Sequence, residues 1–346
     1  MSWTPGPASS LRMPVPDQAR PTLSVVLTGR NDDHGSDFLE RYLRTLRFNH
    51  RELTERGIRH EYVLIEWAPQ PGRPLLADIT LERLPDVRDV LKTYVVDPGY
   101  QEAMSQNPRL GYLEFVAKNV GIRRSNGEFV LSTNCDVFFG KRVLEALRAG
   151  ELLPRTLYRA ARHDLKLGAE PSNVTWDVLE DPRNLDGRPR GLRPPLLQGG
   201  TGDFVLLDRE SIHELCGFNE VYRMARLGPD HNFLVKAYSQ GFEIVDIGGP
   251  VYHLNHRGSY RLSRNMYTGR EAEAPWGDKR WRYHGVVYEN PPGWGLAQAP
   301  KREIGPARWR LDFDWDAVPP LVDLRRVVLP VDRVGRPQPP RYRRKH

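Results

Sequence analysis

The chain has 346 residues and a mass of 39.8 kDa, which is enough for one large domain or two small ones. Hydrophobic residues make up 39% and charged residues 27%, so the composition is that of a globular body and excludes a wholly disordered chain. The formal net charge is +7, and most of the 51 basic residues are arginine. This balance permits a polyanionic partner, although a GC-rich coding background produces the same bias.

Several classes of protein are excluded by simple patterns. No apolar run approaches the ~20 residues of a membrane span. Residues 1–20 lack the apolar core of a secretory signal. The two cysteines, Cys135 and Cys216, are too few for a disulfide scaffold or a four-cysteine zinc site. These features predict a cytoplasmic protein.

Strands and helices alternate over the first half of the chain. Short apolar runs predict strands at residues 23–27, 62–65, 92–96 and 129–131. Helical spacing of apolar residues predicts a helix that begins near residue 36 and another over residues 112–125. This alternation predicts an α/β fold with a mostly parallel sheet flanked by helices.

The second half is less regular. Apolar runs predict strands at residues 157–160, 204–207 and 243–247, followed by an extended segment at 251–256. Helices are predicted over 209–216 and from Pro229 to Gly241, because proline suits the first turn of a helix and glycine its end. Residues 168–197 are rich in proline and glycine and predict a long surface insertion.

The predicted organisation has four parts. They are a disordered arm over residues 1–20, one α/β domain over 21–262, an irregular tryptophan- and arginine-rich extension over 263–329, and a flexible tail over 330–346. The extension is interpreted either as a lid or acceptor-side flap, or as a packing flap.

Four polar clusters lie at the ends of predicted strands, where open α/β sheets bind their ligands. A turn-forming role is the alternative for each one. The clusters are Thr28 to Asp33, Glu66, Asn134 to Asp136, and Asp203, which lies just before its strand.

Asp136 follows an apolar strand and precedes three apolar residues. A carboxylate there is costly unless it binds a cation or accepts hydrogen bonds. Mg²⁺ or Mn²⁺ prefers such oxygen ligands and can bridge Asp136 to a diphosphate. His253 and His256 become plausible metal ligands if the fold brings them to Asp136, and otherwise form a structural pair. Zinc held by the two histidines alone is not expected.

Two further segments carry candidate residues. Asp230 follows Pro229 at a predicted helix start, where a carboxylate is stabilised as an anion, and it is a candidate general base. Lys118 and Asn119 lie on the helix before the Asp136 strand. Lys118 either meets a phosphate or is a solvated surface lysine.

Taken in order, these segments resemble the family 2-like glycosyltransferases of GT-A fold over about residues 22–260. The order and spacing of the segments carry the resemblance, since each one alone is unspecific. They are Ser24 to Asn31 as the opening strand and nucleotide loop, Ala117 to Ile122 with Asn126 to Val130 as the Ala-Arg-Asn-x-Gly … Gly-Glu segment, Asn134-Cys-Asp136 as Asp-x-Asp, Gly202 to Glu210 with Cys216 to Glu220 as the acceptor-side segment, Pro229-Asp230 as Glu-Asp, and Tyr252 to His256 as the metal-ligand histidine region.

The resemblance implies a metal-dependent inverting glycosyltransferase. It would transfer a sugar from a nucleotide-diphosphate sugar, foremost a UDP-sugar, to an acceptor hydroxyl. The lack of a membrane-spanning run favours a small or intermediate-sized acceptor. Asp230 would be the general base, Asp136, His253 and His256 would hold Mn²⁺ or Mg²⁺, and Asp203 and His231 would lie on the acceptor side. The implied donor-binding residues are Thr28, Gly29, Arg30, Asn31, Glu66, Lys118, Asn119, Asn134, Cys135 and Asp136.

The sequence departs from the family pattern at three positions. Asn134 replaces the first aspartate, which predicts a weakened metal site, Pro229 replaces a glutamate, and Lys118 replaces an arginine. The extension beyond residue 260 has no match in the family pattern.

Other functions stay open at this point. A retaining transferase is the nearest alternative, and a sugar-binding relative without activity is suggested by Asn134. A nucleotidyltransferase is less favoured, because no glycine-rich phosphate signature follows the first strand. A polyanion binder fits the charge, but the basic residues are scattered and no RNA-binding or zinc-finger motif is present, so no nucleic-acid partner is expected.

Overall fold

The computed structural model describes residues 22–32, 37–106, 110–166, 174–187, 191–221, 223, 228–256 and 289–320. The predicted arm, the predicted tail and residues 263–288 of the extension lie outside the described residues.

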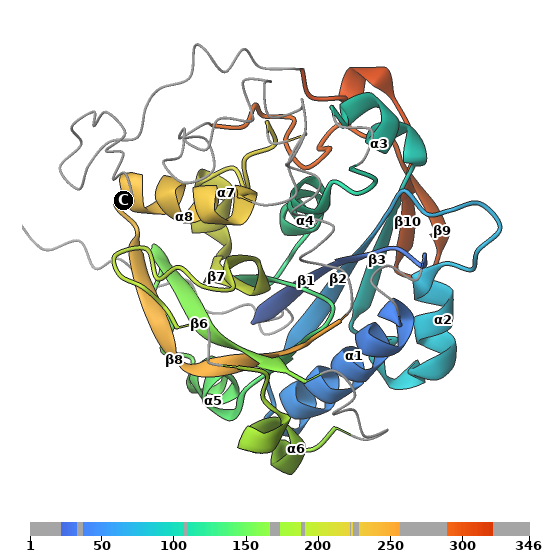
Figure 1. The fold of residues 1–346 in the computed structure, drawn as a ribbon. Coiled ribbons are helices and arrows are strands. Elements are labelled where there is room, and N and C mark those ends of the chain that lie inside the picture. The colour runs from blue at the N-terminus through green and yellow to red at the C-terminus, as the bar shows by residue number, and fades with distance from the viewer. Residues whose placement is uncertain are drawn as a thin grey trace, which may run out of the picture.

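One mixed sheet of ten strands forms the centre of the described structure (Figure 1). Its strands are ordered β5-β8-β6-β7-β4-β1-β2-β3-β10-β9. Their bounds are β1 Leu23–Gly29, β2 His60–Trp67, β3 Leu91–Val96, β4 Phe129–Thr133, β5 Val137–Phe139, β6 Thr156–Leu165, β7 Phe204–Asp208, β8 Glu243–Leu254, β9 Lys301–Gly305 and β10 Arg308–Leu311.

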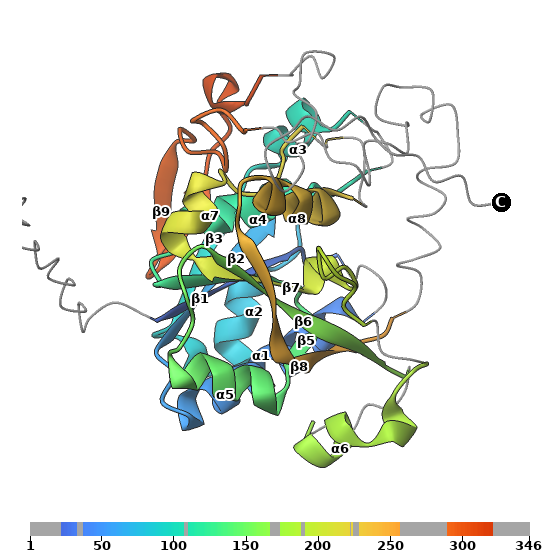
Figure 2. The same ribbon diagram turned by 90° about the vertical axis from the view of Figure 1, so that its left-hand side faces the viewer.

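Helices cover both faces of the sheet. In Figures 1 and 2, α4, α7 and α8 lie on one side of it, and α1, α2 and α5 lie on the other. The helix bounds are α1 Phe38–Glu55, α2 Leu76–Arg83, α3 Pro98–Met104, α4 Glu114–Arg123, α5 Lys141–Ala149, α6 Trp176–Glu180, α7 Arg209–Glu214 and α8 Pro229–Ser239.

The two-sided core follows from the alternation of side chains along each strand. In β1, Val25 and Leu27 pack into the core that contains Tyr42 of α1, whereas Val26 packs into the core that contains Val120 of α4. Strands buried on both faces read as continuous apolar runs, which is why the sequence revealed them. The predicted fold class, an α/β sheet flanked by helices, is confirmed.

The sheet has a parallel part and a largely antiparallel part. Strands β4, β1, β2, β3 and β10 are parallel to their neighbours within this group. On the other side, β7 is antiparallel to β4 and to β6, and β5 is antiparallel to β8, while β6 and β8 are parallel. Asp136 lies just before β5 in this second part, and His253 and His256 lie in and just after β8.

The extension also contributes to the sheet. Residues 289–320 add β10 beside β3 and β9 at the edge, and Trp309 stacks on Tyr94 with ring centroids 5.0 Å apart. The part of the extension that the structure describes therefore continues the same sheet. The two segments expected at 243–247 and 251–256 form one long strand, β8, which ends at Leu254.

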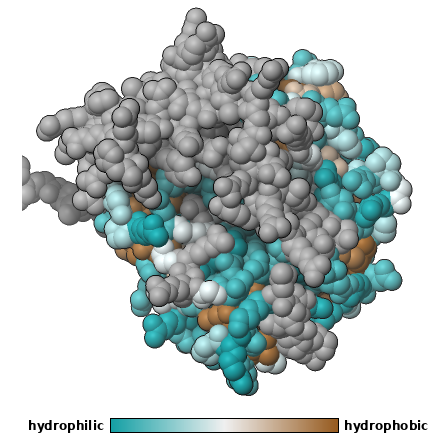
Figure 3. All heavy atoms as spheres, viewed as in Figure 1, coloured by the Kyte–Doolittle hydropathy of each residue, from teal (hydrophilic) through white to brown (hydrophobic). Residues whose placement is uncertain are grey.

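The outer surface of the described residues is mostly hydrophilic on the face shown in Figure 3. Among the described residues, the large hydrophobic side chains that are exposed are Leu153 and Trp315. Within these residues, no helix has the length and apolar character that crossing a membrane requires.

Candidate functional site

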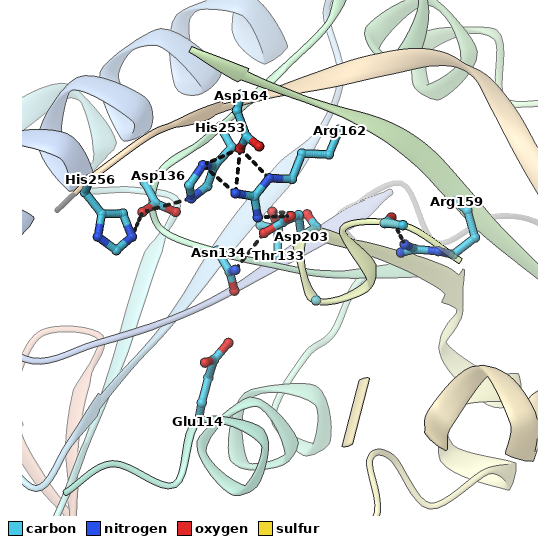
Figure 4. A network of polar contacts seen from close by, with 12 residues as sticks. Glu114, Thr133, Asn134, Asp136, Arg159, Arg162, Asp164, Asp203, His253 and His256 are labelled. Atoms are coloured by element: carbon cyan, nitrogen blue, oxygen red, sulfur yellow. Dashed lines mark hydrogen bonds and ion pairs between the residues drawn. The ribbon is translucent and has the colours of Figure 1, made fainter. Parts of the chain in front are cut away.

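Asp136, His253 and His256 converge at one end of the sheet (Figure 4). Asp136 lies between β4 and β5, His253 lies in β8, and His256 lies two residues after β8. The pairing of Val137 with His253 across β5 and β8 brings the two segments together. The Nε2 atom of each histidine lies 3.6 Å from Oδ2 of Asp136.

These distances suit a cation better than a direct hydrogen bond. At 3.6 Å an imidazole nitrogen and a carboxylate oxygen are too far apart to share a proton, and one ligand atom from each residue lies within 4.8 Å of the others. A carboxylate oxygen and two imidazole nitrogens can ligate Mn²⁺ and leave positions for other ligands. The buried Arg41 guanidinium, from α1, approaches the same Oδ2 atom to 3.7 Å.

The second nitrogen of His253 also has polar neighbours. Its Nδ1 atom lies 3.0 Å from Oδ1 of Asp164 and 2.8 Å from Nη2 of Arg162, both in β6. Burial raises the pKa of the Asp164 carboxyl, but the hydrogen bond with His253 and the charge of Arg162 outweigh it and hold that pKa well below its usual range. Asp164 is therefore an anion beside His253.

Asp203 and Asn134 continue the polar network. Nη1 of Arg162 donates to Oδ2 of Asp203 at 2.7 Å, and Nδ2 of Asn134 donates to Oδ1 of Asp203 at 2.7 Å. Burial raises the pKa of Asp203, but the nearby positive charge of Arg162 more than offsets this and lowers the pKa. Asp203 is buried and positions other side chains of the site.

Lys118 closes the network on the α4 side. Its Nζ atom donates to Oδ1 of Asn134 at 2.7 Å and to the Gly202 carbonyl at 3.0 Å, and it pairs with Glu114 at 2.9 Å. Its side chain is fully buried. Because this side chain is buried, the expectation of a solvated surface lysine is wrong. A buried ammonium group needs polar partners such as these in place of water.

Asp230 lies beside this network in the first turn of α8, where Pro229 occupies the first helical position. A Cβ atom on Gly202 would lie 3.6 Å from Oδ2 of Asp230 and 3.8 Å from Nζ of Lys118, so the two side chains approach Gly202 closely. Asp230 and His231 are both half-buried. Burial lowers the pKa of the nearby Arg159 to about 10, and the charges of Asp203 and Asp230 act in the opposite direction.

The loop after β1 carries the first group of expected donor-binding residues. Arg30 donates to Asp32 at 2.7 Å and to the Gly111 carbonyl at 2.8 Å, and Asn31 donates to the Pro74 carbonyl at 2.9 Å. Thr28 is the last buried side chain of β1. At Gly29 a Cβ atom would lie 2.8 Å from the Phe38 ring, so a larger residue would require that ring to shift.

Three other expected donor-binding residues have protein partners inside the fold. The fully buried Glu66 accepts the Leu76 N–H of α2 at 2.9 Å with both oxygens, and burial raises its pKa to about 7. Asn119 bonds both the N–H and the carbonyl of Phe218 at 2.7 Å. The thiol of Cys135 donates to the Thr28 carbonyl at 3.2 Å. These contacts give each residue a structural role.

Several members of the network carry no predicted role in the sequence. These are Arg41, Glu114, Arg159, Arg162 and Asp164. A signal was present for two of them, because Arg162 and Asp164 are charged residues two positions apart in an extended segment and therefore share one face of the strand. No such signal exists for Arg41, which lies on a helix far from Asp136 in the sequence.

Comparisons with known proteins reveal likenesses at the level of structure. No family model matches the sequence. No curated protein matches it.

Solved structures that the chain resembles include three glycosyltransferases. One is the mannosyltransferase PcManGT from Pyrobaculum calidifontis in complex with GDP-Man and Mn²⁺, with 16% identity, a TM-score of 0.45, and coverage of 81% of this chain and 64% of that one. GalNAc-T7 with UDP, GalNAc and Mn²⁺ has 15% identity and a TM-score of 0.45, with coverage of 78% and 51%. The catalytic domain of Drosophila beta1,4galactosyltransferase 7 in complex with xylobiose has 12% identity and a TM-score of 0.37, with coverage of 86% and 96%. The chain spans less than two thirds of the length of the first two proteins.

Proposed function

We propose that this protein is a metal-dependent glycosyltransferase of GT-A type. It transfers a sugar from a nucleotide-diphosphate sugar to an acceptor hydroxyl. The observation that carries the proposal is the convergence of Asp136, His253 and His256 beside the paired strands β5 and β8. The order of the sequence segments, from the loop after β1 to the histidines in and after β8, agrees with it.

Asp136, His253 and His256 are the proposed ligands of Mn²⁺ or Mg²⁺. The cluster contains one carboxylate and no thiolate, which fits a cation that completes its shell with phosphate oxygens and water. When bound, the cation neutralises the diphosphate as it leaves. Asn134, at the first position of the Asp-x-Asp pattern, is engaged with Lys118 and Asp203, so it is a structural link and not a proposed ligand.

Asp230 is the proposed general base of an inverting reaction. Its carboxylate takes the proton of the acceptor hydroxyl as the oxygen attacks the anomeric carbon, while the bond from that carbon to the diphosphate breaks on the opposite face. Asp230 lies in the first turn of α8, directly after Pro229. His231, half-buried beside Asp230, is the proposed acceptor contact.

The donor is proposed to lie over the carboxyl ends of β1 and β4. Thr28, Gly29, Arg30 and Asn31 border the nucleoside, and the buried ammonium of Lys118 supplies positive charge near the phosphates. UDP is the preferred nucleotide of the proposal. A thermal-shift panel of nucleotide diphosphates with and without Mn²⁺ tests it, because a ligand that binds the native state raises stability by RT ln(1 + [L]/Kd).

The deciding experiment measures nucleotide release from UDP-sugars in the presence of an acceptor. We expect activity with Mn²⁺, loss of activity with a chelator, and a fall of about 10²-fold or more in Asp136→Asn, because the charged ligand is removed. Asp89→Asn, at an exposed carboxylate after α2, is the matched control and retains activity. Full activity after chelation would contradict the metal role.

The same reaction distinguishes inversion from retention. NMR of the product anomer reports the configuration at the transferred carbon. An inverted anomer supports Asp230 as base, whereas a retained anomer selects the retaining transferase, for which Asp230 would need another role.

A further inference from the structure

Asp164 of β6 holds His253 by the nitrogen that faces away from Asp136. Oδ1 of Asp164 lies 3.0 Å from Nδ1 of His253, while Nε2 of the same ring faces Asp136 at 3.6 Å (Figure 4). The two carboxylates therefore lie at opposite nitrogens of one imidazole ring. We infer that Asp164 is a positioning residue that orients His253 and fixes its tautomer for binding a divalent cation through Nε2; this inference rests on the proposed metal site.

The sheet builds this arrangement into the backbone. His253 of β8 is paired with Asp164 of β6 on one side and with Val137 of β5, the residue after Asp136, on the other. The central strand therefore presents His253 between Asp164 of β6 and Asp136, the residue that precedes β5. The position of His253 relative to Asp164 is set by the register of β8 and β6.

Arg162 holds the Asp164 carboxylate in place. It lies two residues earlier in β6, on the same face, and its Nε and Nη2 atoms approach Oδ1 of Asp164 to 2.7 and 2.5 Å. Its Nη1 atom donates to Asp203 at 2.7 Å. A guanidinium shared between two carboxylates has little freedom to move, so Asp164 is fixed relative to the buried Asp203.

The position of the ring proton decides whether Nδ1 of His253 bonds Asp164 or Arg162 when a cation is present. Nη2 of Arg162 also lies 2.8 Å from Nδ1, so a donor and an acceptor face the same nitrogen. A neutral imidazole that uses the lone pair of Nε2 as a ligand carries its proton on Nδ1. That proton can be donated to Asp164 and not to Arg162, so the carboxylate is the partner in the metal-bound state. Such outer carboxylates fix the ring and raise its basicity.

Metal binding by the full chain tests the inference without any transfer reaction. Free Mn²⁺ is counted by its EPR signal while the protein is titrated. We expect Asp164→Asn to weaken Mn²⁺ binding by about 10- to 100-fold, as replacement of such a partner does in other metal sites. Asp186→Asn is the matched control, because exposed Asp186 accepts a hydrogen bond from Asn255 at 2.8 Å, next to the site, without contacting His253. We expect it to bind Mn²⁺ like the wild type.

Two outcomes separate this inference from the proposed function. If the wild type binds Mn²⁺ and folded Asp164→Asn binds it equally well, the role of Asp164 is overturned while the metal site stands. If the wild type binds no Mn²⁺, the metal site fails and this inference fails with it.

A second measurement needs no variant at position 164. In wild-type protein loaded with diamagnetic Mg²⁺, the Nδ1 proton of His253 should give a downfield imidazole N–H resonance, assigned by its loss in His253→Gln. A metal-loaded protein in which Nδ1 of His253 carries no proton would overturn the inference.

Discussion

The parallel and the largely antiparallel parts of the sheet use their polar residues in opposite ways. In the parallel part, Glu66 and Asn119 are buried and bond the backbone of α2 and of the segment at Phe218. In the other part, His253 meets Asp136 at a distance too long for a hydrogen bond. Polar residues of the first kind complete the fold, whereas those of the second kind leave ligand atoms directed at a common point.

This difference predicts that substitutions in the two parts have different consequences. Substitution of Glu66 or Asn119, beside the parallel strands, should lower stability and leave chemistry intact once the protein is folded. Changes around the antiparallel strands and α8 should lower metal binding or rate and leave stability nearly intact.

The largest effect is expected for Asp230→Asn. Removal of the proposed base should lower the rate of transfer by about 10²- to 10⁴-fold at saturating donor, because the acceptor proton then has no carboxylate to receive it. Steady-state kinetics with UDP-sugar and acceptor measures the rate, and thermal shift measures donor binding, which should not change.

Asp246→Asn, at an exposed carboxylate of β8, is the control for the same chemical change. Unchanged turnover in Asp230→Asn would contradict the assignment of Asp230 as the base. Helix α8 would then no longer count among the regions where substitutions lower the rate.

A smaller effect, on stability, is expected for Asn119→Ala. The amide of Asn119 bonds Phe218 N–H, the Phe218 carbonyl and Oε1 of Glu220, and its loss leaves buried polar groups without partners. We expect the free energy of unfolding to fall by about 2–4 kcal/mol, measured by urea denaturation.

Asn184→Ala provides the comparison, because that half-buried amide donates one hydrogen bond, to Val178, and should cost less. Metal binding should not change in folded Asn119→Ala. If Asn119→Ala were as stable as the wild type, Asn119 would not be one of the polar residues that complete the fold.

The smallest expected effect concerns the pH dependence of stability at Glu66. Burial raises the folded pKa to about 7 from a reference of 4.5, so between these pH values the folded protein binds more protons than the unfolded chain. The stability contributed by the protonated carboxyl is present below pH 4.5 and is lost as the pH rises through 7.

Glu66→Gln should remove this dependence, because its amide is neutral throughout and can still accept the Leu76 N–H. Relative to the wild type, the variant should gain on the order of 2 kcal/mol in free energy of unfolding between pH 5 and pH 8. Denaturation curves at both pH values measure the gain. If the free energy of unfolding changed by the same amount in both proteins between pH 5 and pH 8, the raised pKa of Glu66 would be contradicted.

The sequence predicted the parallel part of the fold well because burial on both faces produces unbroken apolar runs. The run from Tyr62 to Ile65 in β2 is an example of such an apolar pattern. The extension escaped prediction because β9 begins with Lys301, Arg302 and Glu303 at an exposed edge, where no apolar pattern is needed. Helix α5 was missed although Val143, Leu144 and Leu147 have helical spacing.

The sequence predicted which residues form the candidate metal site, but not most of the hydrogen bonds that surround it. Asp136, His253 and His256 were named together as possible ligands, and the structure places them side by side. The bonds of Asn134 to Lys118 and Asp203 were not predictable, because they depend on how β4, α4 and the segment before β7 meet. The resemblance implies that Glu66 is a donor-binding residue, and its position at a strand end does not reveal that it bonds the start of α2.

The pairing of β10 with β3 has a consequence for how the chain matures. Thr93 of β3 pairs with Arg308 of β10, which is far away in the sequence. This pairing can therefore form only after roughly 200 further residues have been synthesised. Until then the backbone of β3 offers a free parallel edge to other chains, which is a template for aggregation. Completion of the sheet then moves the edge outward to β9, whose charged residues discourage such pairing. Strands β9 and β10 thus complete this edge of the described sheet late in synthesis, and a nascent chain interrupted before them would carry an unprotected edge.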